Sequence, residues 1–185
     1  MSQRLAALIV LLVLLRIPVL RSQQPRVSEY EVKATYLYNF ARFVEWPPTA
    51  AIAKTEAFPI CVLGQDPFGP ALDSVVSGET IDGKAVSAKR VTKQQDAVGC
   101  RVLYISLSEE TRLKEILTAL GKAGVLTVSD IPQFSQRGGM IQFVQDKNKI
   151  RFEVNLANAG AAGLTLSSEL LKVAVTVRTN PQPGD

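Results

Sequence analysis

The residues that come closest to a known chemical motif are 78–85, with the sequence GETIDGKA. They follow the GxxxxGK pattern of a phosphate-binding loop, but Ala85 stands where a Ser or Thr hydroxyl would hold Mg²⁺. Such a loop also leaves a strand and enters a helix, whose first N–H groups face the phosphate. Here the flanking patterns predict the reverse order, with a helix before the loop and a strand after it. We therefore favour a turn built on Asp82 and Gly83 over a nucleotide site.

Nucleophilic catalysis has little support, because the sequence contains no His. Without an imidazole, neither a Ser–His nor a Cys–His pair can form. A carboxylate-dependent hydrolase stays open, since acids far apart in the sequence can meet in space. Each candidate acid, however, occupies a turn or capping position that already explains it. We expect a protein that is not an enzyme, with no catalytic, cofactor-binding or metal-binding residue. The candidate acids are Asp66, Asp73, Asp82, Asp130 and Glu153.

The first 22 residues have the layout of a secretory signal peptide. Arg4 precedes an apolar run from Leu5 to Leu15, and a polar stretch follows from Arg21. The run is shorter than the ~20 apolar residues that a membrane-spanning helix needs. We expect export with cleavage, and an uncleaved amphipathic anchor is the alternative. Residues 23–179 then form a single domain, and residues 180–185, with the sequence NPQPGD, form a disordered tail.

Cys61 and Cys100 are the only cysteines. In an exported chain a disulfide between them is the default expectation. Their separation, 100 − 61 = 39 residues, would give about 3–4 kcal/mol of stabilisation in the chain-entropy model. The alternative is a pair of buried free thiols. A metal site is disfavoured, because the chain has no His and no CxxC motif.

The charge of the chain argues against nucleic acid as a partner. The net charge is +4, but residues 1–22 contain three Arg and no acid, so the remainder carries only 4 − 3 = +1. A nucleic-acid binder needs clustered Lys and Arg on its folded surface to neutralise phosphates. The basic residues here are scattered, as at Lys89, Arg90 and Lys93.

Hydrophobic periodicity predicts a three-layer α/β fold with a mostly parallel sheet, an antiparallel C-terminal hairpin and helices on both faces. The alternating runs 140–144 and 150–154 predict the hairpin, with residues 146–149 as its turn. Ser106 and Glu109 have the spacing of a capping box. Strands are expected at 58–63, 84–91, 101–105 and 124–128, and helices at 28–46, 67–76, 109–120, 157–162 and 168–177.

The predicted helix 28–46 has an unusually narrow polar stripe, formed by Glu31, Thr35, Tyr38, Arg42 and Glu45. Most of its other residues are apolar, so it must be covered on more than one side. Its aromatic residues at helical spacing favour core packing over a ligand slot, and the extra apolar surface makes a partner surface the alternative. They are Tyr36, Phe40, Phe43 and Trp46.

Two blocks of sequence closely resemble the YfiR-like family of periplasmic proteins. The first is residues 32–47, VKATYLYNFARFVEWP. The second comprises 138–143 (GGMIQF), 150–156 (IRFEVNL) and 162–172 (AGLTLSSELLK). Together they bracket almost the whole chain after the leader, in the order expected for the family.

The resemblance implies a periplasmic regulator that binds and restrains the periplasmic part of an inner-membrane diguanylate cyclase. An outer-membrane lipoprotein would relieve this restraint, with cyclic di-GMP, biofilm formation and motility downstream. Cys61 and Cys100 look like one disulfide of the family's namesake, whose second pair has no counterpart here. The resemblance transfers no partner-binding residues.

Two other functions stay open beside the regulator. The strand ends of an α/β sheet commonly form a ligand crevice, so a periplasmic small-ligand-binding module is the main alternative. A carboxylate-dependent hydrolase acting on cell-wall glycans is the other. The excess apolar surface of the first helix also makes a homodimer plausible.

Overall fold

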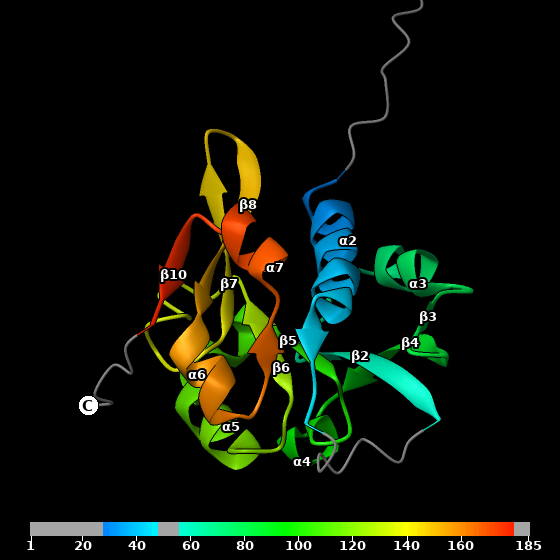
Figure 1. Ribbon diagram of the computed structural model, residues 1–185. Helices are drawn as coiled ribbons and strands as arrows, with labels where there is room; N and C mark the ends of the chain where they lie inside the picture. Colours follow the sequence, from blue (N-terminus) through cyan, green and yellow to red (C-terminus); the bar gives the residue numbers. More distant parts are fainter. Residues whose placement is uncertain (1–27, 48–55, 180–185) are drawn as a thin grey trace, which may run out of the picture.

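The computed structural model describes residues 28–47 and 56–179. The expected signal peptide and C-terminal tail lie outside the described residues. The described part is built on an eight-stranded mixed sheet (Figure 1). The strands, in spatial order, are β10 (Thr176–Arg178), β8 (Lys149–Asn155), β7 (Ile141–Asp146), β6 (Leu126–Ser129), β5 (Val102–Ile105), β2 (Ala57–Leu63), β4 (Lys84–Val91) and β3 (Thr80–Ile81).

Most neighbouring strands run parallel, and the exceptions are the hairpins β3–β4 and β7–β8. Helices cover both faces, so the predicted fold class is confirmed. Strand β2 alternates between the two cores, with Ile60 and Val62 in one and Cys61 and Leu63 in the other. One face packs α2 (Glu29–Arg42), α3 (Pro70–Val76), α6 (Leu156–Ala161) and α7 (Ser168–Val173). The other packs α4 (Gln94–Ala97) and α5 (Leu113–Leu120), and the 3₁₀ helix η2 (Leu107–Arg112) directly precedes α5.

Helix α2 begins where the sequence predicts but ends earlier. The Ser28 hydroxyl and the Glu31 carboxylate form a capping box at its start. It ends at Arg42 rather than near Trp46, because the next residues form β1 (Val44–Glu45). That strand pairs with β9 (Thr165–Leu166), more than 100 residues away in the sequence. A contact at that distance cannot be read from local periodicity.

The last predicted helix, 168–177, is also too long. Helix α7 ends at Val173, and Thr176–Arg178 add a strand parallel to β8. The alternating valines 173, 175 and 177 favour a strand over a helix, because β-branched side chains lose rotamer freedom in helices. Similarly, the region predicted as helix 109–120 is η2 followed by α5, and the Ser106 hydroxyl caps the amide of Ser108 instead of that of Glu109.

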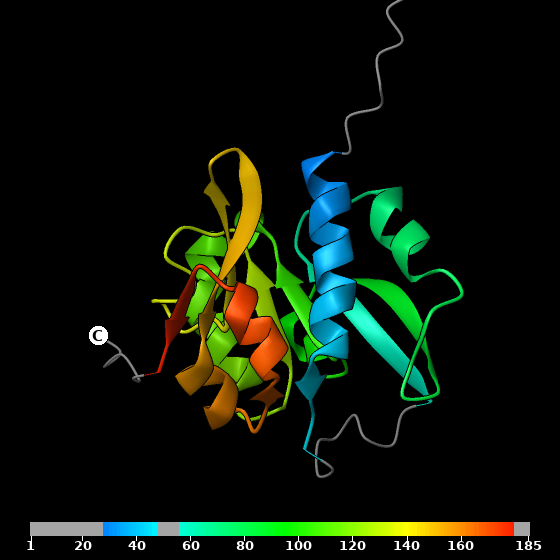
Figure 2. The same ribbon diagram turned by 45° about the horizontal axis from the view of Figure 1, so that its top comes forward.

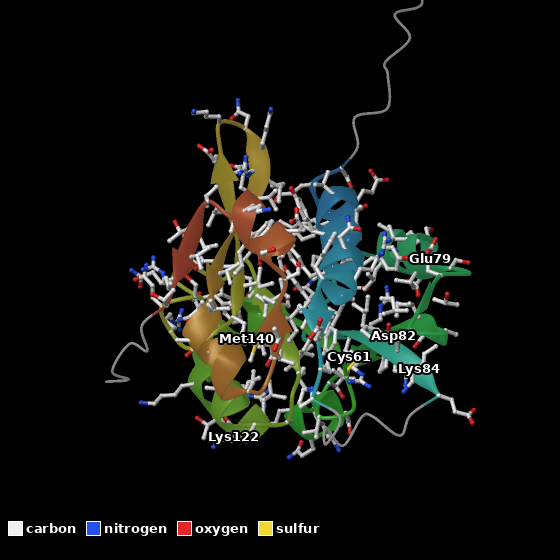
Figure 3. The ribbon with its side chains drawn as sticks, viewed as in Figure 1. Cys61, Glu79, Asp82, Lys84, Lys122 and Met140 are labelled. Carbon is white, nitrogen blue, oxygen red and sulfur yellow. A yellow bond between two sulfur atoms is a disulfide. The ribbon has the colours of Figure 1, made fainter. Side chains whose placement is uncertain are left out.

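The phosphate-loop lookalike is a β-hairpin. Asp82 and Gly83 have φ values of 52° and 75° and form the turn between β3 and β4. Two central residues with positive φ are typical of a type I′ turn. Asp82 and Lys84 lie at the outer edge of the sheet (Figure 3). The predicted turn at Asp82 and Gly83 is therefore confirmed.

A disulfide joins Cys61 in β2 to Cys100, which immediately precedes β5. Both residues are buried, at 0% and 1% exposure. They lie in the core beneath α4 and α5, where the bond holds the segment before β5 against β2. The structure thus places the predicted bond inside one of the two cores.

Replacing both cysteines (Cys61→Ser with Cys100→Ser) should lower the free energy of unfolding by about 3–4 kcal/mol, because the unfolded chain loses a 39-residue cross-link. Urea unfolding of residues 23–185 measures this loss. Dithiothreitol added to the native wild type should have no effect, since both sulfurs are buried. A loss below about 1 kcal/mol would contradict the predicted role of the bond.

Candidate functional site

The acidic residues singled out in the sequence mostly form ion pairs. Asp66 and Asp73 lie on either side of Arg90, whose Nε and Nη2 approach their oxygens at 2.8 and 2.7 Å. Hydrogen bonding from Arg90 lowers the pKa of Asp73, the opposite of what a general acid needs. Glu153 contacts Arg178 at 3.5 Å. The carboxylates that meet in space are therefore held by cations rather than arranged as an acid–base pair.

Asp130 is the centre of a partly buried polar cluster. Lys33 of α2 donates to its Oδ2 at 2.8 Å and to Glu29 Oε1 at 2.5 Å. The hydroxyl of Tyr104 donates to Asp130 Oδ1 at 2.7 Å, and that of Tyr30 lies 3.4 Å from Oδ2. Lys33 is only 3% exposed, although it carries a charge. We call Tyr30, Lys33, Tyr104 and Asp130 the Lys33–Asp130 centre.

The ionisation of this centre follows from its surroundings. Burial alone lowers the pKa of Lys33, but hydrogen bonds to Asp130 and Glu29 outweigh it, and the net shift is upward. Burial, and next the charge of Asp130, raise the pKa of Tyr104. Burial also raises the pKa of Tyr30. At neutral pH Lys33 is therefore a cation held by carboxylates, and both tyrosines keep their protons as donors.

The Lys33–Asp130 centre lies at the carboxyl end of the parallel strands. Asp130 follows β6 directly, and Tyr104 is near the end of β5. In open α/β sheets this end is where ligands commonly bind. A cavity of about 280 Å³ opens beside Glu29, Lys33 and Asp130. A second cavity, of about 400 Å³, lies beside Tyr30 on the side of the loops that follow β2 and β5.

Lys33 is not among the residues that the sequence singles out. The sequence offers Asp130 only as a candidate acid, and it singles out neither Tyr30 nor Tyr104. A signal was present, because Lys33 falls outside the polar stripe of its helix, between Val32 and Ala34. A lysine on the buried side of a helix requires a partner. The identity of that partner could not be read from the sequence, since Asp130 is 97 residues away.

The aromatic residues of the first helix mostly serve the core. Phe40 is 1% exposed and contacts the ring of Phe152 at a centroid distance of 4.9 Å. Tyr36 stacks on Phe40 at 5.6 Å. Phe43 differs, with 39% of its surface exposed. Core packing is thus confirmed for Phe40, and Phe43 leaves apolar surface at the end of α2.

The described residues contain neither a candidate metal cluster nor a candidate membrane-spanning helix. Within residues 28–47 and 56–179, no group of three or more His, Cys, Asp or Glu side chains could hold a metal ion. None of the helices in the same ranges is long and apolar enough to cross a membrane.

Comparison with known proteins identifies the class of this protein. The model of the YfiR/HmsC-like family matches residues 30–175, which span both signature blocks and the Lys33–Asp130 centre. The chain therefore belongs to the YfiR/HmsC-like family. No curated protein matches it significantly.

Two solved structures share the fold at low sequence identity. A conserved domain protein from Vibrio cholerae O1 biovar El Tor str. N16961 is 13% identical, with a TM-score of 0.55 over 82% of this chain. An ABC domain in complex with L-Trp from Streptococcus pneumonia is 10% identical, with a TM-score of 0.51 over 78%. This chain covers 60% of the length of each.

Lys33→Met should lower the free energy of unfolding by about 2–3 kcal/mol, because Asp130 loses its cation while staying largely buried, with a side chain 19% exposed. The matched control is Lys172→Met, which removes a pair with Glu169 whose side chains are 68% and 66% exposed. It should change stability by less than about 0.5 kcal/mol. Equal losses in urea unfolding would refute a special role for the buried pair.

The stability of the protein should fall as pH rises above about 10, where tyrosine ionises in the unfolded chain. The raised pKa of Tyr104 means that the folded chain keeps a proton that the unfolded chain has lost. Linkage then makes stability decrease as pH rises through this window. Tyr104→Phe should make the decline shallower, and Tyr36→Phe, outside the centre, should not. Urea midpoints between about pH 9 and 11 test this, and identical slopes for wild type and Tyr104→Phe would contradict it.

Proposed function

We propose that this chain is a periplasmic regulatory protein that binds and restrains the periplasmic part of an inner-membrane signalling protein. The partner that best fits the family is a diguanylate cyclase, so the protein would lower cyclic di-GMP. The observation that carries this proposal is membership of the YfiR/HmsC-like family over residues 30–175. That family is regulatory and non-catalytic, and it is associated with cyclic di-GMP signalling.

The internal chemistry of the fold agrees with this proposal. The Cys61–Cys100 bond suits an oxidising compartment such as the periplasm. The charged groups of the Lys33–Asp130 centre neutralise one another and orient their neighbours, as expected for a scaffold. Regulation would then act through the outer surface of the fold. An outer-membrane lipoprotein that releases the restraint, and a homodimer, belong to the same proposal.

A periplasmic small-ligand-binding module is the second candidate. Two cavities, of about 280 and 400 Å³, flank the Lys33–Asp130 centre at the carboxyl end of the sheet. The pneumococcal structure of similar fold was determined with L-Trp, which makes L-Trp a reasonable first compound in a thermal-shift screen. A ligand at 100 times its dissociation constant should stabilise the chain by about 2.7 kcal/mol. Stabilisation by a small molecule that leaves cyclic di-GMP unchanged would favour this candidate.

Deletion of the gene in its native host should raise cellular cyclic di-GMP, because the cyclase would lose its restraint. Mass spectrometry of cell extracts measures the nucleotide. Expression of residues 1–185 should restore the low level. The matched control is a chain without residues 1–22. Because this chain would not be exported, it should fail to restore the low level of cyclic di-GMP. An unchanged level in the deletion strain would exclude the cyclase mechanism.

A further inference from the structure

Strand β7 extends beyond its neighbour β6. The pairing of β6 with β7 ends at Ser129, which lies opposite Gln142 of β7. Beyond Gln142, β7 continues to Asp146 with β8 as its partner. The chain turns away from the sheet after Ser129, whose hydroxyl accepts the amide N–H of Ile131 at 3.0 Å. In the described part of the chain, the outer half of β7 therefore has one edge that pairs with no strand.

The backbone of Gln145 faces this open edge. Along an antiparallel pair, residues alternate between those bonded to the partner strand and those directed away from it. The amide of Asn155 donates to the carbonyl of Met140 at 2.7 Å, which places Met140 among the residues bonded to β8. The register is continuous from there to the turn, so Val144 also bonds to β8. Gln145 therefore directs its N–H and C=O groups away from β8.

A groove follows the open edge, and the first turns of α2 form its opposite wall. The cavity measures about 280 Å³. The hairpin of β7 and β8 and the start of α2 project toward the same end of the molecule (Figure 2). One wall is thus a strand edge with available backbone groups, and the other is a helix with ionised side chains. The lining residues are Glu29, Lys33, Asp130, Phe143, Val144, Gln145 and Ile150.

We propose that this groove binds an extended segment of a partner protein, which adds as a strand to the open edge of β7. Strand addition to a sheet edge is a recurrent mode of peptide recognition, in which main-chain hydrogen bonds supply affinity and pockets for alternate side chains supply specificity. The inference deepens the proposed regulatory function. It rests on that function for the identity of the partner, but not for the presence of the binding site.

The chemistry of the groove defines the segment that fits it. Ile150 is partly exposed and lies beside the buried Phe143 on the apolar surface that faces α2, so it suits an apolar side chain. The ionised groups are Glu29, Asp130 and Lys33, which sum to −2 + 1 = −1. Glu29 keeps a side chain 47% exposed and can accept a further cation. Residues two apart in a strand face the same side. The segment therefore carries an apolar and a basic residue two positions apart.

Gln145→Pro tests the proposal in the full-length protein. Proline removes the N–H that would bond to the added strand and is tolerated on strand edges. The hairpin keeps its own ladder, since this N–H points away from β8. Loss of the hydrogen bond should weaken binding about tenfold. Circular dichroism and urea unfolding should show that the fold of the variant is intact.

Val177→Pro is the matched control at another open edge. Strand β10 lies at the end of the sheet, and Val177 is in register with Val154 of β8. Val154 directs its backbone groups away from β7 and toward the residues on either side of Val177. The N–H of Val177 therefore points outward, as that of Gln145 does. This variant should bind like the wild type if the groove, rather than any open edge, is the site.

The probe is the acetylated, amidated pentapeptide TVTKT, which places Val and Lys two positions apart. At millimolar concentration it should slow hydrogen exchange of the Gln145 amide and shift its ¹⁵N resonance. For both variants, binding of TVTKT is followed through the resonances of residues that line the groove. Val177→Pro should bind the peptide like the wild type, and Gln145→Pro should bind it about tenfold more weakly. The charge-reversed peptide TVTET should bind more weakly than TVTKT, because of Glu29.

Three results would overturn the proposal. One is an unchanged Gln145 resonance and exchange rate with TVTKT. Another is equal binding by wild type and Gln145→Pro. The third is protection of the Gln145 amide in the free chain that disappears on dilution to a monomer, because a second copy would then occupy the groove.

The cellular assay separates this inference from the proposed function. Suppose that deletion raises cyclic di-GMP and that expression of Gln145→Pro returns it to the low level as well as the wild type does. The strand site is then wrong and the regulatory function stands. If deletion changes nothing while TVTKT still binds at Gln145, the regulatory function is wrong and the strand site stands.

Discussion

Burial of the Lys33 ammonium group, which is only 3% exposed, requires an anionic partner, and this requirement links the first helix to the sheet. Lys33 projects from α2 toward the sheet and reaches Asp130 at the end of β6. The rings of Tyr30 and Phe143 lie 4.6 and 5.7 Å from its Nζ. Burial of the apolar residues of α2 supplies the energy of docking, but an apolar surface tolerates sliding. The ion pair selects one position of the helix.

The same chain reversal supplies the carboxylate and opens the edge of the sheet. Asp130 stands where β6 ends, and the turn at Ile131 carries the chain away before β7 is fully covered. Had β6 continued, its backbone would fill the groove between α2 and the hairpin. The Lys33–Asp130 centre and the open edge of β7 are thus two consequences of one short strand.

The two faces of the sheet are stabilised in different ways. The face under α2 combines aromatic packing with the buried ion pair. The face under α4 and α5 is smaller and contains the disulfide. Both devices tie together elements that are distant in the chain. A fold secured internally in this manner can devote its surface to recognition, which suits a family whose function is regulatory.

The sequence alone determined the fold class, the order of most elements, the turn at Asp82 and Gly83, and the cysteine pair. These features depend on local periodicity, turn chemistry and composition, which act over a few residues. Tertiary structure decided the end of α2, the pairing of β10 with β8, the partner of Lys33 and the open edge of β7. Each of these depends on residues brought together from distant parts of the chain, and local patterns carry no information about such contacts.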